Sequence, residues 1–411
     1  MSLLIKNATI LDPGSAYNGK QMDVFLKKDK IVAIGKNVKE KANRTLTGKS
    51  LYVSPGWVDV LADYCDPGYE HKETIESGLN AAAAGGFADV LITPNTYPVI
   101  GSKSVLDYVK KKSAYHKVNL QVIGALSKQA EGKELAEMID MQRAGALAFS
   151  DGWKPVQDAG LMLKALEYVK AFKGIIIQVP VEAALSAGGL MHEGELSVKL
   201  GMPGIPAMAE HIMVYRDLEL LRYTKSRLHF SGVSTLAALD LIRQAKKENL
   251  DVSCSVTPYH LLFTDEAVQK YESVFKVSPP LRNEAERKAL IKAVMDGTID
   301  CIATHHRPQD WDGKAKEFEY AGYGMIGQET CLPMLLAAAP KVPVEKWVEL
   351  LSINPRRIFG LSANTIQVDT VARITVFDTE AEWAYNKANK QSLGVNSPWL
   401  ETVIKGQVLN S

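Results

Sequence analysis

Acidic and imidazole side chains near the ends of apolar segments could bind a metal ion. His305 and His306 follow the segment DCIAT, and Asp63 and Asp151 follow two other apolar segments. Imidazole and carboxylate groups are zinc ligands in proteins. Adjacent residues of a strand point to opposite faces, so at most one of the two histidines can share a site with Asp63. The pattern predicts either a weak metal site of Asp63, His305 and Asp151 or an ion pair between His305 and Asp63.

Cys65 lies two residues beyond Asp63, where a nucleophile could sit. A small side chain that fills space is the interpretation we favour. The other three cysteines, Cys254, Cys301 and Cys331, are widely spaced, and no pair has metal-binding or redox spacing. The pattern predicts reduced, buried thiols in a cytosolic protein.

A parallel sheet wrapped by helices is predicted to position these side chains. From Trp57 onward, compact apolar segments alternate with segments that have apolar residues at helical spacing. Eight strands are the number that a closed barrel needs, and chemistry in such barrels lies on the loops after the carboxyl ends of the strands. The predicted strands are 58–62, 89–93, 120–125, 146–150, 174–179, 227–231, 251–256 and 300–304.

The two ends of the chain are predicted to form a second, smaller β unit. Residues 1 to about 54 alternate apolar and polar residues between glycines and prolines, and a strand-like pattern returns after about residue 364. The predicted fold is therefore α/β, with a TIM-like (β/α)8 barrel at 55–362. A small β-sandwich domain is predicted from 1–54 plus 363–411.

Composition excludes several classes of partner. Lys and Arg number 48 against 47 Asp and Glu, so the chain has no overall field to attract nucleic acid or an anionic membrane. No segment has the eighteen or so apolar residues that a membrane span needs. We expect a soluble, cytoplasmic protein whose partners are small molecules or other proteins.

Several long segments resemble the dihydroorotase family of the amidohydrolase superfamily. They include PGWVDVLADYCDPGYEHKETIESG, ITPNTYPVI, MHEGELSVKLGMPGIP, SVTPYHLLFTDE and SPPLRNEAERKALIKAVMDGTIDCIAT. The resemblance implies an amidohydrolase-type barrel. It also implies a zinc-bound water that hydrolyses a cyclic amide, interconverting carbamoyl-aspartate and dihydroorotate, with an aspartate on the last strand as proton shuttle.

Most positions that the resemblance assigns to the metal hold other residue types here. The family ligand positions on the first, fifth and sixth strands are occupied by Leu61, Asp63, Gln178 and Gly232. Asp151 matches a segment from which a carboxylate bridges the metals in the family. Leucine and glycine offer no ligand, and an amide is a poor one compared with imidazole. The resemblance therefore predicts that the metal ligands are lost.

The positions for catalysis and substrate binding are also altered. The catalytic aspartate falls at His305, and an arginine that would hold the substrate carboxylate falls at Cys65. A substrate-contacting asparagine and histidine fall at Ser278 and Gln309. Some substrate-side positions are retained, notably Asn95 in the Pro-Asn-Thr turn.

Three hypotheses follow from the resemblance. The first is a catalytically inactive homologue without metal or other cofactor, a homodimer with a structural or regulatory role alongside aspartate carbamoyltransferase. The second is an active cyclic-amide hydrolase, of the dihydroorotase or hydantoinase type, with zinc in an atypical site. The third is a sensor that binds a pyrimidine precursor in the old cleft, supported by Asn95.

Overall fold

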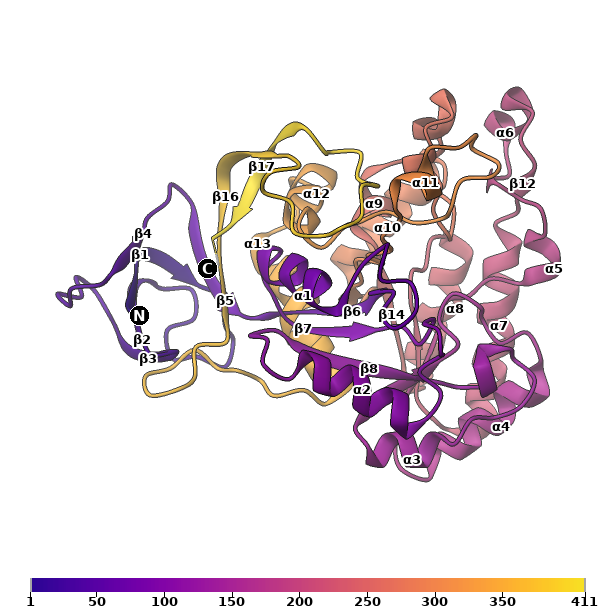
Figure 1. The fold of residues 1–411 in the computed structure, drawn as a ribbon, viewed down its shortest axis with the longest axis horizontal. Helices are drawn as coiled ribbons and strands as arrows, with labels where there is room; N and C mark the ends of the chain where they lie inside the picture. Colours follow the sequence, from indigo (N-terminus) through magenta and orange to yellow (C-terminus); the bar gives the residue numbers. More distant parts are fainter. Residues whose placement is uncertain (1, 410–411) are drawn as a thin grey trace.

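The computed structural model describes residues 2–409, and two sheets organise them (Figure 1). The smaller sheet lies at the left in Figure 1, and the barrel with its helices forms the rest of the molecule. No helix among residues 2–409 has the length and apolar composition needed to cross a membrane.

Eight parallel strands form the central barrel. Hydrogen bonds join them in the order β15-β14-β13-β10-β9-β8-β7-β6, and a parallel bridge between Ala62 and His306 links the two outer strands. The prediction of eight barrel strands is therefore confirmed. The strands are β6 (Trp57–Ala62), β7 (Phe87–Ile92), β8 (Asn119–Ala125), β9 (Ala146–Ser150), β10 (Ile176–Gln178), β13 (Leu228–Phe230), β14 (Val252–Val256) and β15 (Cys301–Ile302).

Helices surround the barrel, and some of them begin at polar caps. Thr74 and Ser77 form a capping box at the first turn of α1, and the Asp158 side chain accepts a hydrogen bond from Leu161 at the start of α4. The longer helices are α1 (Ile75–Ala84), α2 (Lys103–Ser113), α3 (Met138–Arg143), α4 (Ala159–Lys170), α7 (Met208–Thr224), α8 (Leu236–Lys247), α10 (Glu284–Asp296), α12 (Cys331–Ala338), α13 (Val344–Val348) and α14 (Asn354–Phe359).

Shorter helices and strands lie within the loops. These are α5 (Ala183–Ser186), β11 (Met191–His192), α6 (Glu195–Leu200), β12 (Gly204–Ile205), α9 (Pro258–Leu262) and α11 (Trp311–Lys314). They belong to the loops that follow the barrel strands, where sequence predicts the chemistry.

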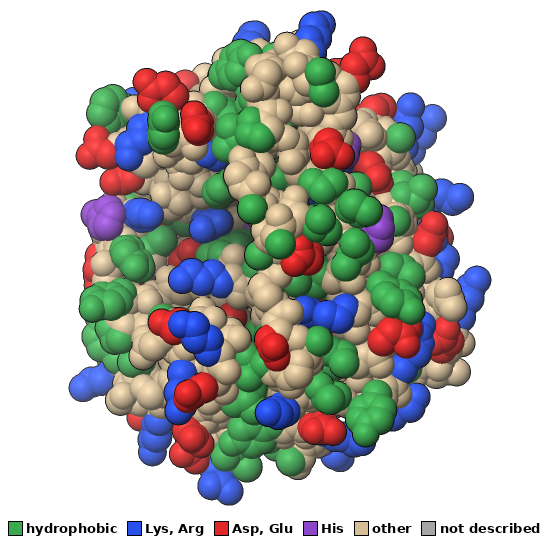
Figure 2. Space-filling model, turned by 90° about the vertical axis from the view of Figure 1, so that its right-hand side faces the viewer, with side chains coloured by type: hydrophobic (Ala, Val, Ile, Leu, Met, Phe, Trp, Pro, Cys, Tyr) green, Lys and Arg blue, Asp and Glu red, His purple; other side chains and the backbone are tan. Residues whose placement is uncertain are grey.

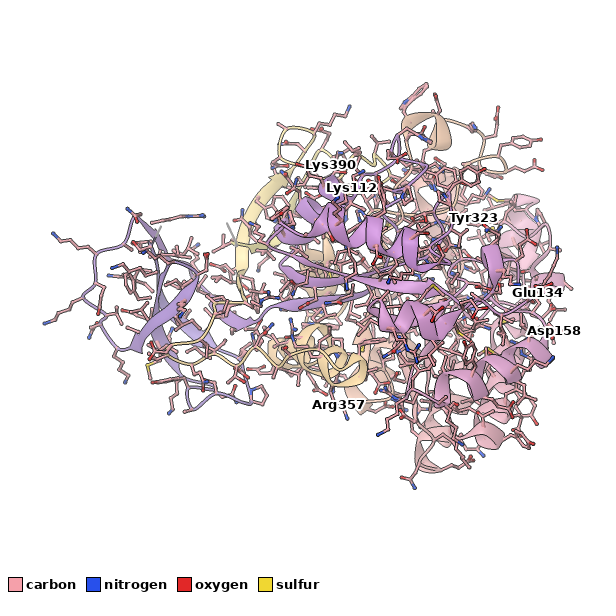
Figure 3. All side chains as sticks on the ribbon, turned by 60° about the horizontal axis from the view of Figure 1, so that its bottom comes forward. Lys112, Glu134, Asp158, Tyr323, Arg357 and Lys390 are labelled. Atoms are coloured by element: carbon pink, nitrogen blue, oxygen red, sulfur yellow. The ribbon has the colours of Figure 1, made fainter. Side chains whose placement is uncertain are left out.

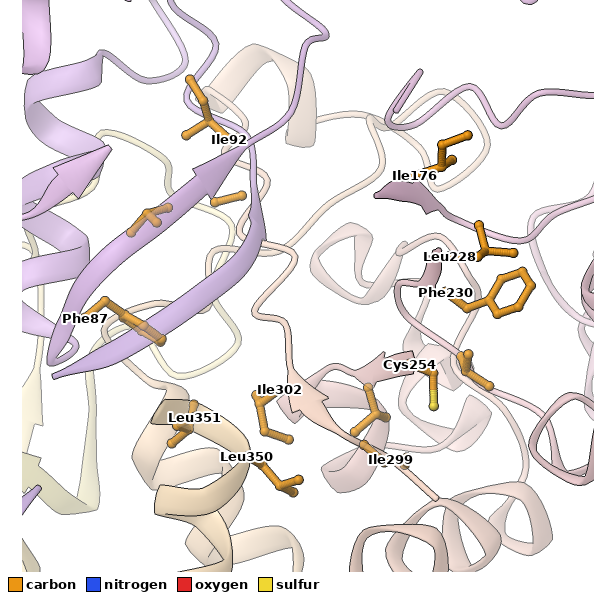
Figure 4. Close-up of a cluster of buried hydrophobic side chains, with 14 of the residues drawn as sticks. Phe87, Ile92, Ile176, Leu228, Phe230, Cys254, Ile299, Ile302, Leu350 and Leu351 are labelled. Atoms are coloured by element: carbon orange, nitrogen blue, oxygen red, sulfur yellow. The ribbon is translucent and has the colours of Figure 1, made fainter. Parts of the chain in front are cut away.

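Two apolar clusters hold the barrel together. One lies between strands and helices and includes Phe230, Ile302 and Leu351 (Figure 4). The second fills the barrel interior and includes Leu61, Ile177 and Val179. Side chains therefore pack the interior, and only its mouth can form a site.

Both ends of the chain build the smaller sheet, as predicted. Its order is β17-β16-β5-β1-β2-β3, with β4 paired to β1. Most pairs are antiparallel, whereas β1 runs parallel to β4 and β5. The strands are β1 (Ser2–Ile10), β2 (Gln21–Lys27), β3 (Lys30–Gly35), β4 (Arg44–Leu46), β5 (Leu51–Pro55), β16 (Ile374–Tyr385) and β17 (Thr402–Val408). The domain boundaries given above stay a prediction.

Candidate functional site

Trp153, in the loop after β9, connects several strand ends at the barrel mouth. Its indole nitrogen donates a hydrogen bond to Asp63 Oδ2 at 2.9 Å, and its ring meets the His305 ring edge-on at 5.3 Å between centroids. The Arg307 guanidinium carbon lies 4.6 Å from the centre of the Trp153 ring. The indole thus joins the ends of β6, β9 and β15.

His305 is buried and does not form the predicted ion pair with Asp63. Its Nε2 lies 2.9 Å from the Ser231 hydroxyl, and its Nδ1 has no hydrogen-bond partner. Burial lowers the pKa of His305 to about 3, so the ring is neutral near pH 7 and has no charge to pair. Asp63 instead accepts hydrogen bonds from the Trp153 indole and the Cys65 amide.

The His305 ring occupies the space next to Gly232 at the end of β13. A Cβ placed on Gly232 would lie 2.4 Å from His305 Cε1, and the backbone has a φ of +76°. A side chain at residue 232 therefore has no room while His305 keeps its position. The imidazole that the resemblance expects at Gly232 is missing, and the ring of His305 occupies its place.

Gln178, which the resemblance assigns to a metal-ligand position, points away from the barrel axis. Its amide reaches outward, to Asp217 Oδ2 on α7 at 3.2 Å and to the backbone of Val156. Ile177 and Val179 belong to the interior cluster. Because successive strand residues alternate between faces, Val179 is the side chain that faces the barrel axis here. Valine offers no metal ligand.

Asp151 does not join Asp63 and His305, so the predicted weak metal site is not assembled. Its carboxylate accepts hydrogen bonds from the backbone amides of Leu126 and Ser127 at 3.0 and 2.9 Å, and from the Ser127 hydroxyl. The carboxylate is thus directed to the end of β8. No group of three His, Cys, Asp or Glu side chains that could hold a metal ion occurs within residues 2–409.

Zinc does not fit the side chains at the strand ends. Leu61 is fully buried in the apolar interior, and the space next to Gly232 is filled. Asp63 alone among the four assigned positions offers a ligand aimed at the mouth, and one of its oxygens already accepts from Trp153. Tight zinc sites in proteins use three or four protein ligands.

Asn95 holds the loop that carries Trp153. Its Nδ2 donates to the Asp151 carbonyl and its Oδ1 accepts from the Trp153 amide, both at 3.0 Å. Gly152 makes this possible, since a Cβ there would lie 1.8 Å from Asn95 Oδ1. Both polar atoms of the Asn95 side chain are therefore engaged with the loop.

The other residues predicted to contact substrate lie in three different surroundings. Cys65 is a buried free thiol whose pKa is raised by burial, so it is not a reactive thiolate. Gln309 donates to the Tyr323 carbonyl at 2.8 Å and supports the backbone there. Ser278 lines a cavity of about 610 Å³. All four cysteines are buried and free, as predicted.

The cavity lies beyond Trp153. Its lining includes Trp153, Arg282, Arg307 and Tyr323, whereas Asn95, Cys65 and Gln309 are absent from it. The volume is in the range of small-molecule sites. Sequence reasoning missed these residues, including the pair of Trp153 and Arg307. Their contact joins loops of two different strands, and no local pattern reports it.

The segment between β16 and β17 also reaches the mouth, which sequence reasoning missed. Glu73 is buried and accepts hydrogen bonds from the Ser392 hydroxyl and, at 3.1 Å, from the Leu393 amide. His306 Nε2 lies 3.4 Å from Glu73 Oε2. Burial alone would raise the pKa of Glu73, but the contacts with His306 and Ser392 hold it below its ordinary value.

Asn396 completes this attachment of residues 391–397, here called the C-terminal strap. Its Nδ2 donates to the Arg307 carbonyl and its Oδ1 accepts from the Gln309 amide, both at 2.9 Å. In Figure 1 this loop runs from the smaller sheet across the barrel toward α9 and α11. The strap therefore fixes the backbone that carries Arg307.

Three other histidines are buried and lie next to hydrogen-bonding groups. His229 Nδ1 lies 2.8 Å from the Ser253 hydroxyl, and His260 Nδ1 lies 2.7 Å from that of Thr257. Burial lowers the pKa of His229 to about 3 and that of His260 and His192 to about 4. All three are neutral near pH 7.

Known proteins with related sequences and folds match nearly the whole chain. A family model for dihydro-orotase-like proteins matches residues 50–237. Dihydroorotase of Syntrophus aciditrophicus (strain SB) is 40% identical over 414 residues, 100% of this chain and 97% of the relative. Dihydroorotase of Pelotomaculum thermopropionicum is 40% identical over 410 residues, 99% and 96% of the two chains.

Solved structures show the same fold. L-Hydantoinase from Arthrobacter aurescens has a TM-score of 0.84 at 23% identity, with 99% of this chain and 93% of that chain covered. A D-hydantoinase has a TM-score of 0.81 at 20% identity, with 100% and 93% covered. An eight-stranded parallel barrel with a separate sheet from both chain ends, and polar side chains at its mouth, defines an amidohydrolase-type protein. With full-length identity of 40% to named dihydroorotases, the chain belongs to the dihydroorotase family.

Proposed function

We propose that this chain serves pyrimidine biosynthesis as a dihydroorotase-family protein that has lost the metal ligands and the hydrolytic activity. One observation carries the proposal: the His305 ring fills the space next to Gly232 where a ligand would stand. Without a metal, no bound water is activated near neutral pH and no Lewis acid polarises the amide. Leu61 and Val179, both apolar and facing the interior, support the same conclusion.

A second candidate is an active cyclic-amide hydrolase. The names of the relatives support this candidate more directly than the first. Eight relatives of 36 to 40% identity each carry the name dihydroorotase. In that case the mouth would use an atypical zinc site, with Asp63 as the side chain best placed to contribute. The two candidates differ in metal content and in turnover.

One experiment separates them. Protein purified without chelator is equilibrated with zinc, manganese and cobalt in turn, and bound metal and dihydroorotate hydrolysis are measured on the same samples. The non-catalytic proposal expects less than about 0.1 metal ion per chain, since a tight ligand set is missing. Near-integral metal that survives dialysis, together with hydrolysis above the metal-free rate, would establish the second candidate instead.

A structural or regulatory role requires a partner, and we propose aspartate carbamoyltransferase together with a homodimer of this chain. An interface is supported by the outer face of α7, where Met208, Ile212, Tyr215 and Tyr223 are exposed at helical spacing. Co-purification of the transferase from the native host tests the partner. Light scattering tests the dimer, which requires twice the mass of the 45.0 kDa chain.

A further inference from the structure

A column of polar side chains crosses the apolar interior of the barrel. It consists of Ser253 and Ser255 of β14 with His229 and Ser231 at the end of β13. These residues alternate along each strand with residues whose side chains belong to the outer apolar cluster, so the four side chains point inward. All four residues are buried. A polar atom inside such an interior needs a hydrogen-bond partner.

Hydrogen bonds join the column into a continuous chain that ends at His305. Ser253 Oγ lies 2.8 Å from His229 Nδ1, and His229 Nε2 lies 3.1 Å from Ser255 Oγ. Ser255 Oγ lies 3.2 Å from Ser231 Oγ, which lies 2.9 Å from His305 Nε2. Two imidazole rings are therefore connected through two hydroxyl groups.

The chain connects the two ends of the barrel. The ring of His229 packs against Phe359 of α14 at 5.4 Å between centroids, and α14 lies beside the start of β6. His305 lies at the mouth. In Figure 3, Arg357 of α14 is well separated from Tyr323, which lines the cavity at the mouth. A change at one end could thus reach the other through the chain.

The geometry decides which atoms donate between Ser255 and His305. Of the two serine hydroxyls, that of Ser255 is placed to donate and that of Ser231 accepts. Ser231 has no other acceptor within residues 2–409, so its own hydroxyl donates to His305 Nε2. The opposite assignment would leave both the Ser231 proton and the His305 Nδ1 lone pair unpartnered, whereas this one leaves only the Nδ1 proton.

The same reasoning assigns the proton of His229. Because the Ser255 hydroxyl donates to Ser231, its oxygen accepts from His229 Nε2, and His229 Nδ1 accepts from Ser253. Burial lowers the pKa of His229 and of His305 to about 3, so each ring is neutral near pH 7 and carries one proton. The two rings are therefore opposite tautomers.

We propose that this column is a one-way hydrogen-bond relay that fixes His305 as the tautomer protonated on Nδ1 and makes that tautomer depend on His229 at the opposite end of the barrel. Each hydroxyl has one proton to donate, so the bonds keep a common direction. In this tautomer the only ring lone pair of His305 is taken by Ser231. His305 is then a hydrogen-bond donor at the mouth, and neither a base nor a metal ligand.

Nitrogen-15 NMR of the full-length protein with labelled histidine tests the tautomers at pH 7, with chelator present. The chemical shift of each ring nitrogen reports whether it carries a proton. We expect His305 to be protonated on Nδ1 and His229 on Nε2. The signals are assigned by their loss in His305→Gln and His229→Leu. A parent protein in which His305 is protonated on Nε2 would overturn the proposal.

Ser255→Ala tests transmission, because it removes the middle of the chain without touching His305. Ser231 can then accept as well as donate, so we expect both tautomers of His305 in the spectrum. The proton of His229 should move to Nδ1, where Ser253 can accept it. His229→Leu should produce the same mixture at His305 from the opposite end of the barrel.

Ser352→Ala is the matched control. Ser352 is also fully buried, but its hydroxyl donates to the Gly56 carbonyl at 3.1 Å, outside the chain. This variant should leave the signals of both rings unchanged, and thermal unfolding confirms that each variant folds. If His229→Leu does not fold, Ser255→Ala decides alone. A single Nδ1 tautomer of His305 in the folded variants, or a mixture in the control, would refute the relay. The readout is the position of a proton, so metal binding or hydrolysis found in the metal experiment would leave this result standing.

Discussion

The indole of Trp153 and the carboxylate of Asp63 form a hydrogen bond of 2.9 Å that links the end of β9 to the end of β6. Asp63 is buried, so the bond satisfies a charged oxygen that water cannot easily reach. This contact therefore helps to stabilise the barrel mouth.

Trp153→Phe removes the donor and keeps an aromatic ring. We expect a loss of about 1 to 3 kcal/mol in the free energy of unfolding, since a buried acceptor is left without its partner. Urea denaturation measures it. In a double-mutant cycle with Asp63→Ala, the two effects should not add, because both substitutions break the same bond. Full additivity would show that the two residues are not coupled.

Stability should fall in acid because four buried histidines are neutral in the folded protein. The pKa of His305 and His229 is lowered to about 3, and that of His260 and His192 to about 4. Below about pH 6.5 these histidines bind protons in the unfolded chain but not in the folded chain. Their contribution to the free energy of unfolding is therefore fully present above that pH and is lost as pH falls toward 4. Each histidine contributes a slope of up to about 1.4 kcal/mol per pH unit.

Denaturation at a series of pH values checks this expectation. His305→Gln keeps a polar group near Ser231 and removes one titrating ring, so its slope between pH 6 and 4 should be shallower than that of the parent. His71→Gln is the control, because His71 lies on an exposed part of the chain. Equal slopes for the His305 variant and the parent would contradict the pKa assigned to His305.

A rebuilt ligand set tests which residue of β10 faces the barrel axis. One variant combines Leu61→His, Asp63→His, Gly232→His, His305→Asp and Val179→His, and a second carries Gln178→His in place of Val179→His. We expect more zinc per folded chain in the first, because Gln178 reaches outward to Asp217. Elemental analysis gives the zinc content, and circular dichroism reports folding. If the second variant bound as much zinc as the first or more, residue 178 and not residue 179 would face the barrel axis.

Glu73→Gln should loosen the C-terminal strap. The neutral amide weakens the bonds from Ser392 and Leu393 and removes the negative charge next to His306, at a cost of about 1.5 to 3 kcal/mol. Hydrogen exchange at the Leu393 amide should become faster. Glu382→Gln, at an exposed position of β16, is the matched control and should leave that exchange unchanged.

Sequence predicted the barrel strands well because each is a short and mostly buried segment between helical segments, and VSCSV of β14 is buried throughout. It placed Gln178 at a family ligand position but could not show that the side chain lies on the outer face of β10, where it reaches Asp217. It did not give the surroundings of Asp63 and His305, because Trp153 from a third strand end lies against both. Contacts between distant loops are set by the closed barrel and leave no local pattern.

Charged side chains of both signs are mixed over the end face of the barrel in Figure 2, which agrees with the balanced composition. No broad field of one sign covers that face. A charged molecule that approaches this face therefore meets local charges and no long-range field of one sign.

The C-terminal strap also makes the form of the barrel mouth depend on a segment that follows every barrel strand in the chain. Asn396 fixes the backbone of Arg307 and Gln309, and Ser392 and Leu393 bind Glu73. A chain cut short before residue 391 would contain all eight barrel strands and still lack these bonds. Only a chain that extends through residue 397 can hold its mouth in the form described above.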